Sequence, residues 1–282
     1  MPAVRLLVVG GYHEEERWRV PRLPRPGEPV TASAFERSPG GKAWHQAVAA
    51  ARSGVVTGLI AAIGDDVIDP SGLPGHTVAR WQLVPGTRTG RATEIGDGKG
   101  PTLSVLSHGA NDHLSAAFVA KQSDLFAEAR VLLVSAQTHI DTVAATLELA
   151  GERRMLRLFD PGPLPPGLSV REFASTDVLL LDVYEFAHAC GHFLNIDISA
   201  QAVTGMGDTT INALARRLCA GTVVVSLDRS CLVSHGADRR GDDAELYRLP
   251  TCGMGDRFKG VLAAKLVDAE RFRDALTAAC NV

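Results

Sequence analysis

Short apolar runs alternate with alanine-rich stretches along most of this 282-residue chain, and that alternation constrains the fold more than any other feature. Runs that are apolar throughout predict buried strands, here Val4–Val9, Gly58–Ile63, Val131–Ser135, Arg157–Asp160, Asp177–Leu181 and Val223–Leu227. The stretches with helical character are Lys42–Ser53, Leu114–Lys121, Ile140–Ala150, Thr209–Ala220 and Asp256–Val267. Buried strands separated by helices favour a mainly parallel sheet covered on both faces, whose ligands bind at the carboxyl ends of the strands.

Two segments interrupt the alternation. Tyr12–Pro39 is polar and rich in proline and arginine, and Thr87–Ser107 alternates small, polar and β-branched residues. Both predict antiparallel strands that lie outside the main sheet, as a lid would. The proline-rich Pro161–Gly167 fits a loop after a strand better than a linker. We therefore expect one domain over residues 1–282, with lid segments at 12–39 and 87–107.

Composition narrows the class of function. The chain is 45% hydrophobic, enough for a large core, and its net charge of −3 gives no basis for binding nucleic acid. Its apolar runs are too short for a membrane span, and its N-terminus lacks the apolar length of a signal peptide. An odd number of cysteines without C-x-x-C spacing predicts free thiols in a reducing, cytoplasmic environment. These cysteines are Cys190, Cys219, Cys231, Cys252 and Cys280.

The segment Thr251–Leu266, TCGMGDRFKGVLAAKL, combines a glycine loop with a charged helix start. Two glycines flank Met254, and Asp256 then opens an amphipathic helix. Backbone N–H groups in such a loop, with the positive end of the helix, can hold the charge of a transferring phosphoryl group. A carboxylate at the same place can accept a proton from a hydroxyl. The alternative is an ordinary loop with an N-capping aspartate.

The same four letters, GMGD, also occur at Gly205–Asp208, again before a predicted helix. Local chemistry alone does not separate the two copies. We interpret this first copy as an N-cap, with Thr209 and Thr210 in the opening turn of the helix.

A second glycine turn begins the segment Gly40–Gly54, GGKAWHQAVAAARSG. Such a turn lets a substrate approach the backbone, and it would place Lys42 near anionic groups. The alternative is a simple turn followed by a solvated lysine.

Together these segments resemble the ribokinase/PfkB family of sugar kinases. GGKAWHQAVAAARSG is similar to its N-terminal signature, usually GGKGANQAVAAARLG, and TCGMGDRFKGVLAAKL to its C-terminal signature, usually DTTGAGDAFVGALAAAL. Between them, LPRPGEPV resembles the approach to the first lid strand, SHGANDHLS resembles PGANAALT, and FDPGPLPP resembles the strand-end NPAP segment. The resemblance covers nearly the whole chain.

The resemblance implies a ribokinase-like three-layer α/β/α sandwich with a mainly parallel sheet and a small β-sheet lid, through which a homodimer would form. It implies ATP-dependent phosphorylation of the hydroxymethyl group of a sugar, nucleoside or related small alcohol, with Mg²⁺ bridging phosphate oxygens largely through water. Asp256 would be the base, and the backbone of Gly253, Met254 and Gly255 the anion hole.

On the substrate side the chain departs from the family pattern. The family's first strand usually ends G-S-x-N-x-D, so Glu15 replaces a sugar-binding aspartate and His13 an asparagine. Trp44 and His45 replace alanine and asparagine of GGKGAN, and Gln137 replaces a later glutamate. These changes predict an acceptor other than ribose, which stacks on Trp44 and contacts the titratable rings of His13 and His45. The alternative is that Trp44 only packs in the core. The implied acceptor-binding residues are His13, Glu15, Gly41, Lys42, His45 and Gln137.

The phosphate side departs further. The family's N-x-x-E becomes Asp182 to Glu185, where Glu185 would bind Mg²⁺. The nucleotide motif T-x-G-x-x-G begins at Ser226, and it has lost both glycines, so that Asp228 would sit near phosphates. The aspartate tied in the family to a monovalent cation is Pro250, which argues against that cation.

Two functions therefore stay open at the level of sequence. The intact G-x-G-D motif and Glu185 favour an active kinase. The lost nucleotide glycines favour a catalytically inactive or repurposed relative that binds a small molecule without phosphoryl transfer.

Overall fold

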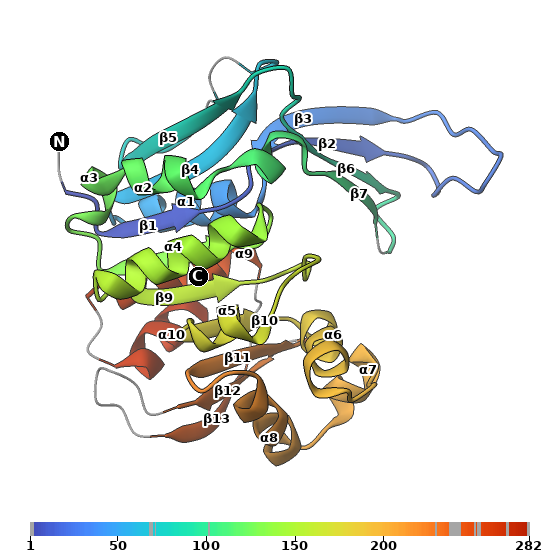
Figure 1. Ribbon diagram of the computed structural model, residues 1–282. Coiled ribbons are helices and arrows are strands. Elements are labelled where there is room, and N and C mark those ends of the chain that lie inside the picture. Colours follow the sequence, from blue (N-terminus) through green and yellow to red (C-terminus); the bar gives the residue numbers. More distant parts are fainter. Residues whose placement is uncertain are drawn as a thin grey trace.

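The computed structural model describes residues 3–67, 70, 72–100, 102–228, 230–236, 244–250, 252, 255–268 and 271–280. These residues form a large sheet between two layers of helices and a separate smaller sheet, which confirms the predicted fold class (Figure 1). Among them, no helix combines the length and the apolar character that crossing a membrane requires.

The large sheet has nine strands, and its parallel part contains all six predicted strands. In spatial order it comprises β13 (Glu245–Pro250), β12 (Ser230–His235), β11 (Thr222–Leu227), β10 (Val178–Leu181), β9 (Leu156–Asp160), β8 (Val131–Ser135), β1 (Leu6–Val9), β4 (Thr57–Gly64) and β5 (Thr77–Val84). The strands from β11 to β5 pair in parallel, whereas β12 and β13 add antiparallel strands at one edge. The parallel strands end at one edge of the sheet, where ligands bind in such folds.

Helices cover both faces because the parallel strands are apolar on both sides. In β1, for example, Leu6 and Val8 join one core cluster while Leu7 and Val9 join the other. The first face carries α1 (Lys42–Arg52), α9 (Asp256–Leu266) and α10 (Phe272–Cys280). The second carries α2 (Ala116–Lys121), α3 (Ser123–Phe126), α4 (Ile140–Glu152), α5 (Val170–Ala174), α6 (Val183–Leu194), α7 (Ala200–Gly205) and α8 (Asp208–Leu218), and a 3₁₀ turn, Gly109–His113, precedes α2.

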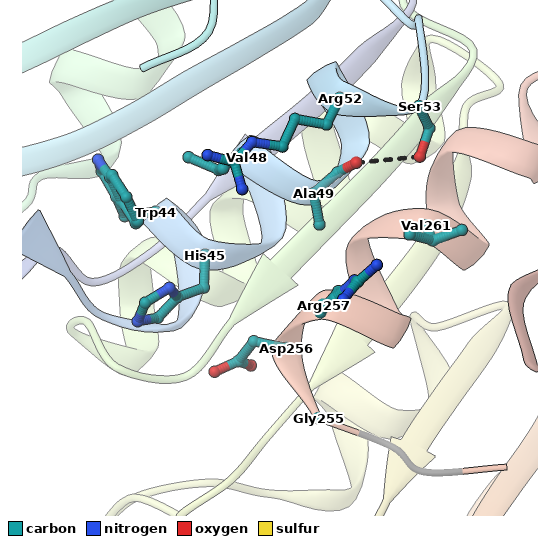
Figure 2. Close-up of a pocket in the computed structure, with 10 residues that line it drawn as sticks. All are labelled: Trp44, His45, Val48, Ala49, Arg52, Ser53, Gly255, Asp256, Arg257 and Val261. Carbon is teal, nitrogen blue, oxygen red and sulfur yellow. Dashed lines mark hydrogen bonds between the residues drawn. The ribbon is translucent and has the colours of Figure 1, made fainter. Parts of the chain in front are cut away.

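The two helices that carry the glycine motifs, α1 and α9, pack directly against each other. Their contact is close because Gly260 has no side chain: a Cβ there would lie 2.2 Å from the carbonyl oxygen of Gln46. The first turns of both helices lie side by side, with His45 of α1 near Asp256 of α9 (Figure 2).

The smaller sheet is made of the two segments that we predicted outside the main sheet. Its order is β3 (Ala34–Gly40), β2 (His13–Arg19), β6 (Gly90–Gly96) and β7 (Leu103–Ser107). The β2–β3 and β6–β7 pairs are antiparallel as expected, but β2 and β6 pair in parallel, which corrects the prediction. The reason lies in the large sheet: β2 follows β1 and β6 follows β5, and those two strands run in the same direction.

The prediction that all five cysteines are free thiols is wrong for two of them. Cys252 and Cys280 form a disulfide, while Cys190, Cys219 and Cys231 are free and buried. The bond joins residues 28 positions apart and links the segment before α9 to the last helix. Only the packing of α10 brings the two sulfur atoms together, so spacing in the sequence could not reveal the pair.

Candidate active site

Asp256 is the first residue of α9, and its carboxylate faces other polar side chains instead of capping the helix. The N-cap is Gly255, which offers no side chain. Gln46 Nε2 donates a hydrogen bond of 3.1 Å to Asp256 Oδ1, and Lys42 Nζ lies 3.8 Å from the same oxygen. Burial raises the pKa of Asp256, although the nearby ammonium of Lys42 opposes that shift. The alternative of an N-capping aspartate is therefore excluded here.

The first GMGD copy, Gly205–Asp208, has a different environment. Asp208 is the first residue of α8, and its N-cap is Gly207, so the predicted N-cap role of Asp208 is wrong. Its carboxylate instead forms an ion pair with Arg248 of β13, where both side chains are about 40% exposed. Tertiary position thus separates two motifs that are identical in sequence.

Two lysines, the buried Lys259 and the partly buried Lys42, surround the carboxylate of Asp160, the last residue of β9. Lys259 Nζ donates a hydrogen bond of 2.7 Å to Asp160 Oδ1, and Lys42 Nζ lies 3.2 Å from Oδ2. Burial alone would raise the pKa of Asp160, but the ammonium groups of Lys259 and Lys42 hold it below its usual value. The side chain of Asp160 is therefore an ion in the interior of the protein.

Gln46 connects this buried cluster to Asp256. Its Nε2 donates to Asp160 Oδ2 at 2.8 Å and to Asp256 Oδ1 at 3.1 Å. Lys42 also spans the two carboxylates, so Asp256 is held by the same side chains that hold Asp160. The cluster fixes the carboxylate of Asp256 relative to the turn that begins α1.

Sequence reasoning missed three members of this cluster, namely Gln46, Asp160 and Lys259. For Lys259 and Asp160, the sequence does depart from the family pattern in a way that could have indicated them. Lys259 stands where the C-terminal signature has valine, and Asp160 stands where the NPAP segment has asparagine. A lysine on the apolar side of a helix and a carboxylate at a strand end are a complementary pair, which could have suggested their contact.

The predicted acceptor residues are brought together around the turn before α1. Glu15 Oε1 accepts a hydrogen bond of 3.0 Å from Gly41 N and lies 2.7 Å from His45 Nε2. Gln137 Oε1 accepts one of 3.0 Å from Lys42 N. Burial would raise the pKa of Glu15, but its hydrogen bonds with His45 and Gly41 lower that pKa overall. Burial would lower the pKa of His45, but its hydrogen bond with Glu15 raises that pKa overall. An ionised Glu15 beside a protonated His45 is therefore favoured.

His13 lies behind this turn and is completely buried. A Cβ at Gly41, where φ is 85°, would lie 2.8 Å from His13 Nδ1, so glycine allows the turn to pass over the ring. Burial, with a contribution from His108, lowers the pKa of His13 to about 4. His13 Nδ1 has no hydrogen-bond partner among the described residues. The ring is neutral at physiological pH.

Asp182 and Glu185 lie at the start of α6, after β10. They cap the helix reciprocally: Asp182 Oδ1 accepts from Glu185 N at 2.7 Å, and Glu185 Oε2 accepts from Asp182 N at 2.9 Å. Burial raises the pKa of Glu185 to about 7, although Lys259 and Lys42 oppose the shift. Each cap uses one carboxylate oxygen, so a second oxygen of each residue is left for a hard cation, and the pair fits Mg²⁺ held largely through water.

The predicted nucleotide residues Ser226 and Asp228 lie at the end of β11. Leu227, the last residue of β11, pairs with Ser230, the first residue of β12. Asp228 adopts φ of 49°, in the left-handed region that favours glycine and that aspartate tolerates. Position 228 thus keeps a conformation suited to glycine although the glycine is absent. Of the predicted anion hole, Gly253 and Met254 lie outside the described residues, and Gly255 is the N-cap of α9.

A cavity of about 600 Å³ opens beside Asp256, between α1 and α9 (Figure 2). His45 and Asp256 lie at one end, and Ser53 and Val261 lie at the other. Trp44 also lines it: the indole is half-buried, packs on the core and meets His45 edge-on at a ring distance of 5.1 Å. The two interpretations of Trp44, core packing and a face toward a ligand, are thus both compatible with its position.

Comparisons with known proteins find similar sequences along nearly the whole chain. The family model described as pfkB family carbohydrate kinase matches residues 7–282. The chain is 26% identical to the ribokinase of Haemophilus influenzae over 277 residues, which cover 96% of this chain and 88% of that protein.

Solved structures show the shared fold. The ribokinase of Thermotoga maritima matches with a TM-score of 0.76 and 21% identity, over 98% of this chain and 90% of that one. The ribokinase of Arabidopsis thaliana, complexed with ribose and ATP, matches with a TM-score of 0.74 and 17% identity, over 99% of this chain and 90% of that one.

Proposed function

Because the chain belongs to the pfkB family of carbohydrate kinases, we propose that it transfers the γ-phosphoryl group of ATP to the hydroxymethyl group of a sugar, a nucleoside or a related small alcohol. The observation that carries this proposal is the position of Asp256. Its carboxylate stands at the start of α9, free of any capping role, beside Gln46 and Lys42.

In the proposed reaction, Asp256 accepts the proton of the acceptor hydroxyl while that oxygen attacks the γ-phosphorus and ADP leaves. The raised pKa of Asp256 makes it a better proton acceptor than an ordinary aspartate, and Lys42 at 3.8 Å keeps it ionised before the reaction. The N–H groups at the start of α9 point toward the transferred group and stabilise its charge.

The acceptor would bind between the turn before α1 and the lid strand β2. Glu15 and His45 supply its polar contacts, since their side chains are 13% and 32% exposed and already order each other. Such an ordered carboxylate can accept hydrogen bonds from substrate hydroxyls without losing much side-chain freedom. Trp44 would offer an aromatic surface beside them.

The phosphate groups of ATP would lie near the turn at Ser226 and Asp228, and Asp182 and Glu185 would hold Mg²⁺, which neutralises phosphate charge. The ATP complex of the Arabidopsis relative supports this donor. A bound cation is needed for a further reason: the carboxylate of Asp228 would otherwise repel the phosphates. With Pro250 in place of the family aspartate, we expect no dependence on a monovalent cation.

We also propose a homodimer through the smaller sheet. Phe35, Trp18, Ile95 and Leu103 are register partners, and they form an apolar row across all four strands. Trp18 and Phe35 are 37% and 50% exposed, with ring centroids 4.3 Å apart. Side chains alternate along a strand, so this row lies on the face opposite to Glu15 and away from the acceptor. A second copy of the chain can cover this face without blocking the site.

The test is to incubate the protein with ATP, Mg²⁺ and a panel of sugars and nucleosides, and to measure ADP and the phosphorylated product by mass spectrometry. We expect ADP formation that depends on one class of acceptor. If an acceptor bound tightly, as judged by a raised melting temperature, yet no acceptor gave ADP, a binding protein without phosphoryl transfer would replace the proposal.

A further inference from the structure

Three cysteine sulfur atoms lie close together in the described part of the chain. Cys231 of β12, Cys252 in the segment before α9 and Cys280 of α10 place their Sγ atoms within 4.8 Å of one another. Cys231 and Cys252 are buried, and Cys280 is partly buried. Cys252 and Cys280 share the disulfide, while Cys231 is a free thiol. The proposed phosphoryl transfer uses none of these sulfurs.

We propose that these three cysteines, when the disulfide is reduced, form a binding site for one soft metal ion, Zn²⁺ or Cu⁺. Sulfur ligands bind such ions in preference to hard cations. Around a tetrahedral zinc ion, with Zn–S bonds of about 2.3 Å, sulfur atoms lie about 3.8 Å apart. The three sulfurs are therefore already within about 1 Å of the largest separation that a shared ion requires, once the disulfide is reduced.

The ligand set consists of sulfur alone. Binding of an ion would remove the protons of the three thiols, because a coordinated thiol is deprotonated. No histidine, aspartate or glutamate joins this group of three in the described part of the chain. Cu⁺ can accept three sulfur ligands alone, whereas Zn²⁺ would take a fourth ligand from the solvent.

The disulfide and the metal site exclude each other. An external dithiol reduces the Cys252–Cys280 bond: it supplies two electrons and two protons and is itself oxidised to a disulfide. Metal binding then releases the three thiol protons to the solvent and forms three metal–sulfur bonds. Either state ties the segment before Asp256 to the last helix, but only the metal state also includes β12.

The experiment uses the full chain, reduced with dithiothreitol that is then removed under argon. Titration with Co²⁺ should give a sulfur-to-cobalt charge-transfer band that saturates at one ion per chain and disappears on addition of Zn²⁺. A parallel titration with Cu⁺ against a chromogenic chelator tells which of the two ions binds more tightly. Cys231→Ser, Cys252→Ser and Cys280→Ser should each lose the band.

Cys190→Ser and Cys219→Ser are matched controls, because these cysteines are also buried and free but lie outside the group. Both should keep the band. A reduced wild-type chain that binds neither Co²⁺, Zn²⁺ nor Cu⁺, or a Cys231→Ser variant with an undiminished band, overturns the proposal. If a variant fails to fold, the reduced wild type is tested instead. Zn²⁺ or Cu⁺ should slow alkylation of Cys280 by N-ethylmaleimide at least tenfold, and a rate that neither ion changes overturns the site. None of these readouts depends on kinase activity.

Discussion

Lys259 Nζ lies 2.7 Å from Asp160 Oδ1, and the two side chains are 4% and 0% exposed. The pair joins α9 to the end of β9 across 99 positions of sequence. Lys259 stands three residues after Asp256 on the same helix, so both face the same side. The ion pair therefore sets the position of Asp256 relative to the sheet.

Asp160→Asn should destabilise the protein strongly, because it leaves the ammonium groups of Lys259 and Lys42 without their shared carboxylate. Removing one partner of a buried ion pair typically costs about 3–5 kcal/mol. Urea unfolding at pH 7 measures the change in the free energy of unfolding. The double variant Asp160→Asn/Lys259→Met should regain part of the lost stability, since it removes one of the uncompensated charges.

The exposed pair of Arg171 and Glu148 is the control, and Arg171→Ala should change the free energy of unfolding by less than about 1 kcal/mol. A stable Asp160→Asn single variant would contradict this account of the cluster.

Asp256→Asn should lower turnover by about 10²- to 10⁴-fold, the usual contribution of a positioned base. Asparagine keeps the size and can still contact Gln46, so the melting temperature and acceptor affinity should stay close to those of the wild type. The measurement is ADP formation at saturating acceptor, with binding followed by calorimetry. Asp208→Asn, in the identical GMGD motif, is the matched control and should keep full turnover. Equal turnover of wild type and Asp256→Asn would remove Asp256 as the base.

The buried His13 should make the folded state less stable as the pH falls from about 6.5 to about 4. Its pKa is lowered from 6.5 to about 4, so within this window the unfolded chain binds more protons than the folded one. The full shift corresponds to about 3 kcal/mol, present above pH 6.5 and lost progressively below it. His13→Asn, which cannot titrate, should show a flatter dependence of the unfolding free energy on pH. Parallel profiles for the two proteins would show that His13 does not titrate as its environment indicates.

Trp18→Glu should convert the proposed homodimer into a monomer, because a carboxylate in the apolar row opposes its burial against a second copy. Light scattering after size-exclusion chromatography gives the mass of each species. Leu83→Glu is the control: Leu83 is 56% exposed on β5 and lies outside the smaller sheet, so the dimer should persist. A wild type that is monomeric at all concentrations would refute the dimer.

The sequence predicted the parallel core well because its strands are buried on both faces and therefore apolar throughout. β5 escaped prediction for the opposite reason: it is an edge strand, half-buried, with Arg80 and Gln82 among its residues. β13 is the other edge strand, whereas β12 is internal and buried but has an apolar run of only Cys231, Leu232 and Val233 between polar residues. Edge strands lack the uniform apolar signal that periodicity detects.

In the candidate site, too, some residues could be proposed from sequence and others could not. The acceptor residues could be proposed from sequence because each aligns with a segment of the family pattern. The contacts of Asp160 with Lys259 and of Cys252 with Cys280 depend on which elements become neighbours, and local sequence does not specify that. The two GMGD motifs make the point most directly, since only their surroundings distinguish Asp256 from Asp208.

The close contact at Gly260 couples α1 to α9 just beyond the first turn of each helix, so a shift of one helix should move the other. One turn orders the groups that would recognise the acceptor, and the other carries the carboxylate that would activate it. Specificity and rate are then not separately adjustable in this protein. A substitution along the α1–α9 contact that reshapes acceptor recognition will also shift Asp256, so directed evolution toward a new acceptor should select compensating changes in the opposite helix.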